Sequence, residues 1–318
     1  MTSGGEGTRE GGSDAGGRTG DERTHAPHPS RGDARRGAAP ESHADAGIVE
    51  TMSRTTAPER AFDVRAFARD ARGSHRDALD LAAFVDAPLD DVALRLVAVL
   101  HHVEAATMGR LRDMLVTATH KDARVTAFLV TWAYERFWIA DALKAILDAH
   151  DHPTELHGRT RFRPRELAER RGPVRRAILA NLTGTDVIAV HASTGLVDEW
   201  IIGEAFGALA RHAKHATVDV LAGIVDDVQS RHLEFLQQEA ERRLAASPRA
   251  RRLSRRAILG GAWPIGAIHV PARARHLLER LTFAGAHGRL ALERVRDRVA
   301  ALPGMDATAT RLAARLVA

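Results

Sequence analysis

The chain has 318 residues, no cysteine and a formal net charge of +5, with a sequence pI of about 10.4. The absence of cysteine excludes disulfides, thiolate nucleophiles and thiolate metal ligands, so only histidine and carboxylate side chains are left as candidate ligands. Alanine, leucine, valine and arginine dominate the chain beyond its N-terminal part, and this composition favours helices.

The N-terminal segment, residues 1–58, is rich in Gly, Ser, Arg, Asp and Glu and contains almost no large apolar side chain. Such a segment cannot bury enough apolar surface to offset the entropy of ordering it, so we predict a disordered tail. It lacks the apolar run of a secretory signal, and no stretch of the chain approaches the roughly 20 apolar residues of a membrane span. We therefore expect a cytoplasmic protein without a membrane span.

A long capped helix is predicted after a short helix-like stretch over residues 64–85. Asp90 and Asp91 are suited to the N-cap position. Beyond them, apolar residues recur at spacings of three and four, which is the periodicity of one buried helix face. Glu104 and Met108 fall on that face, so the sequence predicts a carboxylate in the core.

A second helix is predicted over residues 122–149, where apolar residues again recur at helical spacing. Arg136 lies four residues after Trp132 and three before Ile139, and these spacings place it on the buried stripe. Glu135 is predicted at the edge of that stripe. The sequence thus predicts a buried cation on this helix.

Residues 150–190 interrupt the helical pattern with proline and glycine. A connection of about 40 residues is too long for a hairpin between neighbouring helices. Long crossovers of this kind join the second and third helices of some four-helix bundles. The sequence therefore predicts a crossover connection.

A third helix is predicted over residues 193–215 and a fourth over 218–245. Glu199 lies on the apolar stripe of the third helix. Gln229 and His232 interrupt the apolar stripe of the fourth. Each of the four predicted helices thus carries polar residues on its core face.

The C-terminal part, residues 248–318, begins with a basic segment and continues with two short helices, predicted over 273–283 and 287–302. We expect these helices to pack on a bundle formed by residues 59–247. The predicted organisation is therefore a tail, a helical bundle and a small helical extension.

Two runs of arginine account for much of the basic character. They are Arg159, Arg161, Arg163, Arg165, Arg170, Arg171, Arg175 and Arg176, and Arg242, Arg243, Arg249, Arg251, Arg252, Arg255 and Arg256. Such clusters can hold phosphate groups. No zinc finger, RNA-recognition signature or clear helix-turn-helix accompanies them, so we do not expect nucleic acid as a partner. A contact between the crossover and nucleic acid or an anionic surface stays open as an alternative.

The polar residues on the four stripes can be compared with the ligands of a di-metal bundle. Such a bundle uses one Glu from each of two helices and a Glu-x-x-His pair from each of the other two, because residues i and i+3 project to one face. The corresponding residues here are Glu104, Arg136 with Ile139, Glu199, and Gln229 with His232. Half of these positions keep a side chain that can bind iron or manganese.

The second helix resembles that of the ferritin-like superfamily, in particular acyl-ACP desaturase-like and related actinobacterial ferritin-like proteins. Their second helix reads Trp-x-x-Glu-Glu-x-x-His. This chain keeps the Trp and the first Glu as Trp132 and Glu135, but has Arg136 and Ile139 in place of the two ligands. The motif is therefore present in degraded form.

The fourth helix is similar to the same family's Asp-Glu-x-Arg-His motif, which an aromatic residue follows three positions later. This chain keeps Arg231, His232 and Phe235 and replaces the Glu by Gln229. The resemblance covers about residues 88–245. It implies a ferritin-like antiparallel four-helix bundle, whose family chemistry is oxygen activation at two metals.

The charges suggest a replacement for the metals. An intact site has four carboxylates that two divalent ions neutralise, because buried unpaired charges are costly. Here Arg136 can pair with Glu104 or Glu199, and a protonated His232 can pair with the other carboxylate, so the cluster can be neutral without a metal. We therefore predict a pseudo-di-iron bundle that needs no cofactor and acts as a binding or interaction protein.

Two alternatives stay open. In the first, these polar residues are unrelated core groups. In the second, a reduced iron or manganese site survives, in which Glu135 slips into register or Glu204 and Asp227 join the other ligands, and the protein is an oxidoreductase of the oxygenase or desaturase type. The sequence identifies no catalytic residue, substrate or partner, and leaves open whether the chain forms a homo-oligomer.

Overall fold

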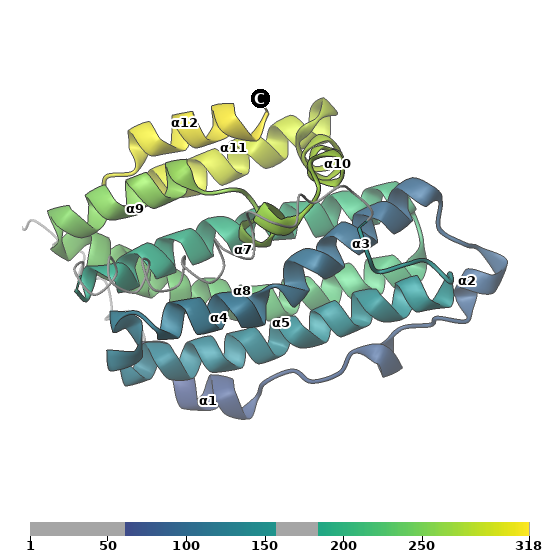
Figure 1. Ribbon diagram of the computed structural model, residues 1–318, viewed down its shortest axis with the longest axis horizontal. Helices are drawn as coiled ribbons and strands as arrows, with labels where there is room; N and C mark the ends of the chain where they lie inside the picture. The colour runs from purple at the N-terminus through teal and green to yellow at the C-terminus, as the bar shows by residue number, and fades with distance from the viewer. Residues whose placement is uncertain (1–60, 157–183, 318) are drawn as a thin grey trace, which may run out of the picture. The chain divides into compact units, whose positions relative to one another are not determined.

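The computed structural model describes residues 61–156 and 184–317. Within these ranges the chain is helical and contains no strand (Figure 1). This confirms the predicted all-α class. The chain divides after Ala57, and Pro58–Ala318 form one compact unit. The predicted disordered tail lies outside the described residues.

Four long helical segments form the centre of this unit. They are α3 (Asp91–Ala105) continued by α4 (Thr107–Leu115), α5 (Ala123–Ala149), α7 (Asp186–Ala213) and α8 (Ala216–Ala246). The side chain of Asp90 caps α3 by accepting a hydrogen bond from the N–H of Ala93 at 2.7 Å. Asp122 caps α5 in the same way, at 3.1 Å from the N–H of Val125.

Shorter helices precede and follow the central segments. Those on the N-terminal side are α1 (Val64–Arg69), η1 (Arg76–Ala78), α2 (Ala83–Asp86) and, before α5, η2 (Ala118–Lys121). Those on the C-terminal side are α9 (Pro248–Gly260), η3 (Ile265–His269), α10 (Ala272–Phe283), α11 (Gly285–Ala301) and α12 (Asp306–Leu316). The two helices predicted in the C-terminal part are present as α10 and α11, whereas α9 and α12 were not predicted.

Neighbouring central segments are antiparallel, as pairs of contacting residues show. Between α3 and α5 the pairs are Leu89 with His150 and Glu104 with Arg136, and between α5 and α8 they are Arg124 with Glu239 and Glu135 with His232. Between α7 and α8 the contacting pairs are Gly195 with Leu236 and Gly203 with Gln229. Between α7 and the α3–α4 segment the pairs are His212 with Asp90 and Asp198 with Arg110. It follows that α5 and α7 run in the same direction.

The hydrophobic core is divided by a layer of polar side chains. On α5, Trp132 belongs to one apolar cluster and Ile139 to another, and Arg136 lies between them. On α8, Phe235 and Val228 likewise belong to different clusters on either side of His232. The polar layer therefore crosses the bundle near its middle.

The C-terminal helices share the core of the bundle. Ile258 of α9, Val295 of α11 and Leu312 of α12 belong to the same apolar cluster as Phe128 of α5. Helices α9, α10 and α11 contact α7, and α12 lies over α9 and α11 (Figure 1). The predicted boundary after residue 247 is thus a boundary between helices, not between hydrophobic cores.

Three expectations about the helices were wrong. The first long helix is interrupted at Ala106, which ends α3 and precedes α4. Met108 does not belong to the core, because its side chain is 51% exposed. The third helix begins at Asp186, seven residues before the predicted start, and the stretch over residues 64–85 forms three short helices instead of one.

One stretch meets the criteria for a membrane span. Among the described residues, Asp91–Leu115 is long and apolar enough to cross a membrane by length and composition alone. Half of its most apolar part is buried inside the molecule. A core helix of a bundle meets the same criteria, so this is weak evidence for a span.

Candidate functional site

The polar layer brings together four of the six predicted positions, one from each central helix. Glu104 comes from α3, Arg136 from α5, Glu199 from α7 and His232 from α8. All four side chains are buried. The predicted stripes therefore do face one another, and the polar residues on them form one continuous network of ion pairs.

Arg136 is the centre of this network. Its Nε and Nη2 atoms donate to the two carboxylate oxygens of Glu104 at 2.7 and 3.1 Å, which is a bidentate pair. Its Nη1 atom donates to Glu199 Oε1 at 3.1 Å and to Asp198 Oδ2 at 3.2 Å. The sequence predicted one carboxylate partner for Arg136, whereas the guanidinium binds three.

The partner of His232 differs from the prediction. Its Nε2 atom lies 2.8 Å from Oε2 of Glu135, at hydrogen-bond distance. Its Nδ1 atom lies 3.5 Å from Oε1 of Glu199 and makes no hydrogen bond. The closest carboxylate to His232 is therefore the one that the sequence placed at the edge of the α5 stripe.

Glu135 is fully buried, which corrects that placement. Its Oε1 atom accepts hydrogen bonds from the backbone N–H of Arg72 at 2.7 Å and from Nη2 of Arg231 at 2.6 Å. The segment that follows α1 and the side chain of Arg231 cover this face of α5. The periodicity of α5 by itself contains no sign of either covering element.

Asp198 and Arg110 complete the network and were not predicted. Asp198 Oδ2 accepts from Nη1 of Arg110 at 2.8 Å, and Asp198 Oδ1 accepts from the backbone N–H of Ile265 at 2.6 Å. Because Ile265 begins η3, the C-terminal part of the chain contacts the polar layer directly. The only sequence signal for Asp198 was its position next to Glu199.

Trp132 packs against the cations and binds one of the anions. Its indole Nε1–H donates to Glu199 Oε1 at 2.7 Å. The guanidinium groups of Arg110 and Arg136 lie 5.4 and 5.3 Å from its ring centroid, within the range of a cation–π contact. Trp132 therefore helps to position the guanidinium groups of Arg110 and Arg136.

The network is nearly balanced in charge. Four carboxylates, those of Glu104, Glu135, Asp198 and Glu199, face three guanidinium groups and the imidazole of His232. One proton, held by either His232 or a carboxylate, makes the network neutral. Since unpaired charges are costly in a buried site, this balance explains how four acids can be accommodated in the core.

The acids of the network differ in pKa because Arg136 is shared among them. Burial raises the pKa of Glu199, but Arg136, His232 and Trp132 together outweigh it and lower that pKa to about 2. Burial also raises the pKa of Glu104, where Arg136 opposes it only in part, and that pKa is raised to about 7. Glu199 is therefore ionised at neutral pH, whereas Glu104 gains or loses its proton near neutral pH.

His232 and Glu135 favour their charged forms. Burial lowers the pKa of His232, but hydrogen bonding to Glu135 and the charge of Glu199 outweigh it, so the pKa is raised above its usual value. Burial raises the pKa of Glu135, but His232, Arg72 and Arg231 outweigh it and the pKa is lowered. Both shifts favour the arrangement in which His232 holds the proton and Glu135 is ionised.

The remaining predicted positions do not add metal ligands. Ile139 belongs to the apolar core, and Gln229 is buried beside Gly203, where a Cβ atom on the glycine would lie 3.0 Å from the amide oxygen. Glu204 pairs with Arg294 at 2.7 Å, and Asp227 is exposed, so neither joins the site. Among the described residues no group of three or more His, Asp or Glu side chains is arranged to hold a metal.

Comparison with known proteins identifies no relative. No family model matches the chain, and no curated protein or solved structure matches it significantly. The resemblance to the ferritin-like superfamily therefore depends on the motifs quoted from the sequence.

Proposed function

We propose that this protein is a metal-independent, ferritin-like bundle in which a buried ionic network stands in place of a di-metal centre, and that it acts as a binding or interaction protein. The observation that carries this proposal is the position of Arg136. Its guanidinium binds Glu104, Asp198 and Glu199 at 2.7 to 3.2 Å, in the place where a metal ion would have to bind the same carboxylates.

The chemistry of the side chain supports the replacement. A guanidinium is charged at every physiological pH and directs its N–H groups in a rigid plane that suits carboxylates. A metal ion placed between Glu104 and Glu199 would face this fixed positive charge. The layer already holds three guanidinium groups and an imidazole for its four carboxylates, so it is poorly suited to a further cation.

The directions of the helices support the ferritin-like topology. Helices α5 and α7 run the same way, so the end of α5 and the start of α7 lie at opposite ends of the bundle. Helix α7 has 28 residues, which corresponds to about 42 Å at 1.5 Å per residue. A returning connection of that length is expected of the crossover in ferritin-like bundles. The connection itself lies largely outside the described residues.

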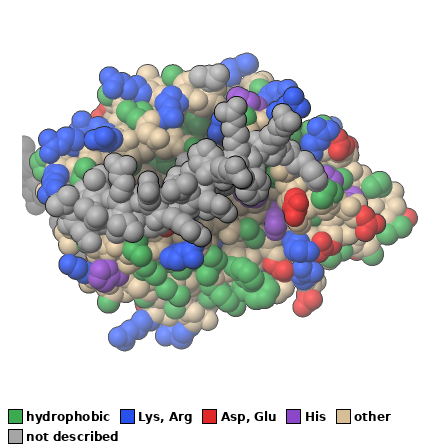
Figure 2. All heavy atoms as spheres, viewed as in Figure 1, with side chains coloured by type: hydrophobic (Ala, Val, Ile, Leu, Met, Phe, Trp, Pro, Cys, Tyr) green, Lys and Arg blue, Asp and Glu red, His purple; other side chains and the backbone are tan. Residues whose placement is uncertain are grey.

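An exposed apolar stripe on α5 supports an interaction role. Val130, Tyr134 and Phe137 follow one another at spacings of four and three and are each about half exposed. Figure 2 shows hydrophobic side chains gathered over the part of the molecule where α5 runs in Figure 1. Contiguous apolar surface of this kind is typical of regions that contact other molecules.

The rival function is an iron- or manganese-dependent oxidoreductase with a reduced site. One observation favours it: Nδ1 of His232 and Oε2 of Glu199 are buried and lack hydrogen-bond partners. Glu199 and His232 would then bind a single ion through these two atoms. The proposal and its rival differ in whether the purified chain retains a metal.

Metal analysis of the full chain tests the proposal. The protein is incubated without oxygen with Fe(II) or Mn(II), freed of excess metal and analysed by mass spectrometry. We expect well under one ion per chain, with a melting temperature that chelators do not change. Retention of about one or two ions per chain, lost in His232→Ala, would contradict the proposal and favour its rival.

A restored variant supplies the matched control. The triple change Arg136→Glu, Ile139→His and Gln229→Glu recreates the full ligand pattern of the family. If the bundle has ferritin-like geometry, this variant should bind about two ions per chain and gain stability with them. A folded triple variant that binds none, as judged by circular dichroism and metal analysis, would contradict the ferritin-like register.

A further inference from the structure

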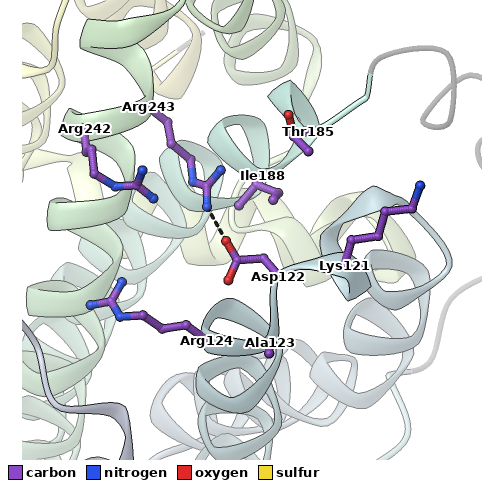
Figure 3. Close-up of a pocket in the computed structure, with 8 residues that line it drawn as sticks. All are labelled: Lys121, Asp122, Ala123, Arg124, Thr185, Ile188, Arg242 and Arg243. Atoms are coloured by element: carbon purple, nitrogen blue, oxygen red, sulfur yellow. Dashed lines mark hydrogen bonds and ion pairs between the residues drawn. The ribbon is translucent and has the colours of Figure 1, made fainter.

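A basic cleft lies at one end of the bundle, away from the buried network. It has a volume of about 590 Å³ and is lined by residues from the start of α5, the start of α7 and the end of α8 (Figure 3). Four of its lining side chains are cationic: Lys121, Arg124, Arg242 and Arg243. We propose that this cleft binds a small anion that carries several phosphate groups, such as pyrophosphate or tripolyphosphate.

The cleft has a surplus of positive charge. Asp122 pairs with Nη2 of Arg243 at 2.6 Å. Glu239, which is buried beside the cleft, pairs with Arg124, with Nη2 of Arg242 at 2.7 Å and with Nε of Arg243 at 2.8 Å. Two carboxylates thus face four cations, and two positive charges are left for a ligand to neutralise.

Glu239 holds the three arginines in position. Without a shared acid these like charges would repel one another, and their long side chains would sample many rotamers. The ring of Phe235 supports Arg124 from one side, at 4.9 Å from its guanidinium carbon. Because the guanidinium groups are held in place before a ligand arrives, less conformational entropy is lost on binding.

The cations keep hydrogen-bond donors for a ligand. A guanidinium has five N–H donors, and in this cleft Arg242 uses one nitrogen and Arg243 two in the ion pairs described. The side chain of Lys121 is exposed and takes part in none of the ion pairs described for this cleft. In Figure 3 the arginine side chains extend from α5 and α8 toward the space between them. Phosphate oxygens, which accept several N–H bonds at once, match this arrangement.

The helix directions add to the attraction for anions. Helices α5 and α7 both begin at the cleft, so the positive ends of two helix dipoles lie at the same place. Asp122, which caps α5, and Asp186 in the first turn of α7 each offset part of this effect, and they pair with Arg243 and Arg249 respectively. The fixed partial charges thus have the same sign as the side chains.

The lining favours phosphate groups over a nucleobase. A volume of about 590 Å³ is within the usual range for small-molecule sites. None of the lining residues is aromatic, so the cleft offers no ring on which a base could stack. We therefore expect tripolyphosphate to bind at least as tightly as ATP, because both present the same phosphates and only the phosphates find partners.

Calorimetric titration of the full chain tests this proposal. The ligands are inorganic phosphate, pyrophosphate, tripolyphosphate and ATP, at physiological ionic strength. We expect one oligophosphate per chain, with affinity rising from phosphate to tripolyphosphate. In the double variant Lys121→Ala, Arg242→Ala the affinity should fall by at least about tenfold. Replacing Arg242 should leave the fold intact, because Glu239 keeps its ion pairs with Arg124 and Arg243.

The control separates a defined site from attraction to a basic protein. Arg289 and Arg298 are exposed on α11, and the double variant Arg289→Ala, Arg298→Ala removes the same charge away from the cleft. It should bind tripolyphosphate as the wild type does. The proposal is overturned if both double variants lose affinity equally, if no oligophosphate binds, or if a short RNA or DNA duplex displaces tripolyphosphate at lower concentration, since this would identify a nucleic-acid surface.

Discussion

Arg136 holds Glu104 through two hydrogen bonds, at 2.7 and 3.1 Å, between side chains that are both almost completely buried. Nearby on the surface, Arg76 holds Asp141 through two hydrogen bonds of 2.7 and 2.9 Å. The geometry of the two pairs is nearly the same, and their surroundings are opposite. Comparing the two pairs therefore separates the effect of burial on protein stability from the effect of the hydrogen bonds themselves.

The substitution Arg136→Leu should lower the free energy of unfolding by about 3 to 5 kcal/mol, because three buried carboxylates lose their shared cation. The matched change Arg76→Leu should cost no more than about 1 kcal/mol, since its pair is exposed to solvent. Urea unfolding followed by circular dichroism measures both. Similar losses in the two variants would show that Arg136 does not neutralise buried charge.

The two glutamates that bind Arg136 should respond differently to removal of their charge. The pKa of Glu199 is lowered to about 2, so its ionised form stabilises the fold at pH 7, and Glu199→Gln should cost about 3 kcal/mol. The pKa of Glu104 is raised to about 7, so its protonated form is favoured in the fold. Glu104→Gln, which mimics that form, should cost less than Glu199→Gln.

The pH dependence of the same variants has a definite sign. The native state keeps the proton of Glu104 to about pH 7, whereas the unfolded state releases it near pH 4.5. The contribution of Glu104 to the free energy of unfolding therefore falls as the pH rises through this window. Glu104→Gln cannot lose this proton, and it should therefore gain stability relative to the wild type between pH 4.5 and 7. Unfolding measured at pH 5, 6, 7 and 8 would contradict this if the difference were constant.

The contact between η3 and α3 can be tested through one glycine. A Cβ atom at Gly266 would lie 2.8 Å from the backbone oxygen of Val103, so Gly266→Ala should displace η3 and cost about 1 to 3 kcal/mol. Because Ile265 donates to Asp198, proteolysis of the C-terminal segment should also become faster. Gly223 in α8 has no atom near its Cβ position, and Gly223→Ala should instead stabilise by about 0.5 to 1 kcal/mol. Equal effects would mean that η3 does not pack closely on α3.

The sequence predicted the central helices well where a single periodic stripe extends through the whole element. Helix α5 begins one residue from its predicted start, and α8 differs by two residues at its start and one at its end. The interruption at Ala106 could not be predicted in this way, because the spacing of apolar residues continues across it. Tertiary packing, not local pattern, decides that break.

The same reasoning explains which members of the polar layer were found. Glu104, Arg136, Glu199 and His232 were found because each interrupts an apolar stripe. Asp198 and Glu135 lie on faces that become buried only when η3 and the segment after α1 cover them. One helix contains no information about elements that are distant in sequence, so neither residue could be assigned to the core.

Arg136 differs from a bound ion in one further respect. Its charge belongs to the polypeptide and is in place as soon as the chain folds, so it cannot dissociate, be exchanged for a competing ion or be withheld by scarcity. The positive charge around which α3, α5 and α7 pack is therefore supplied by the chain itself. The charge of Arg136 is therefore constant. The net charge of the polar layer changes only when a group such as Glu104 or His232 gains or loses a proton.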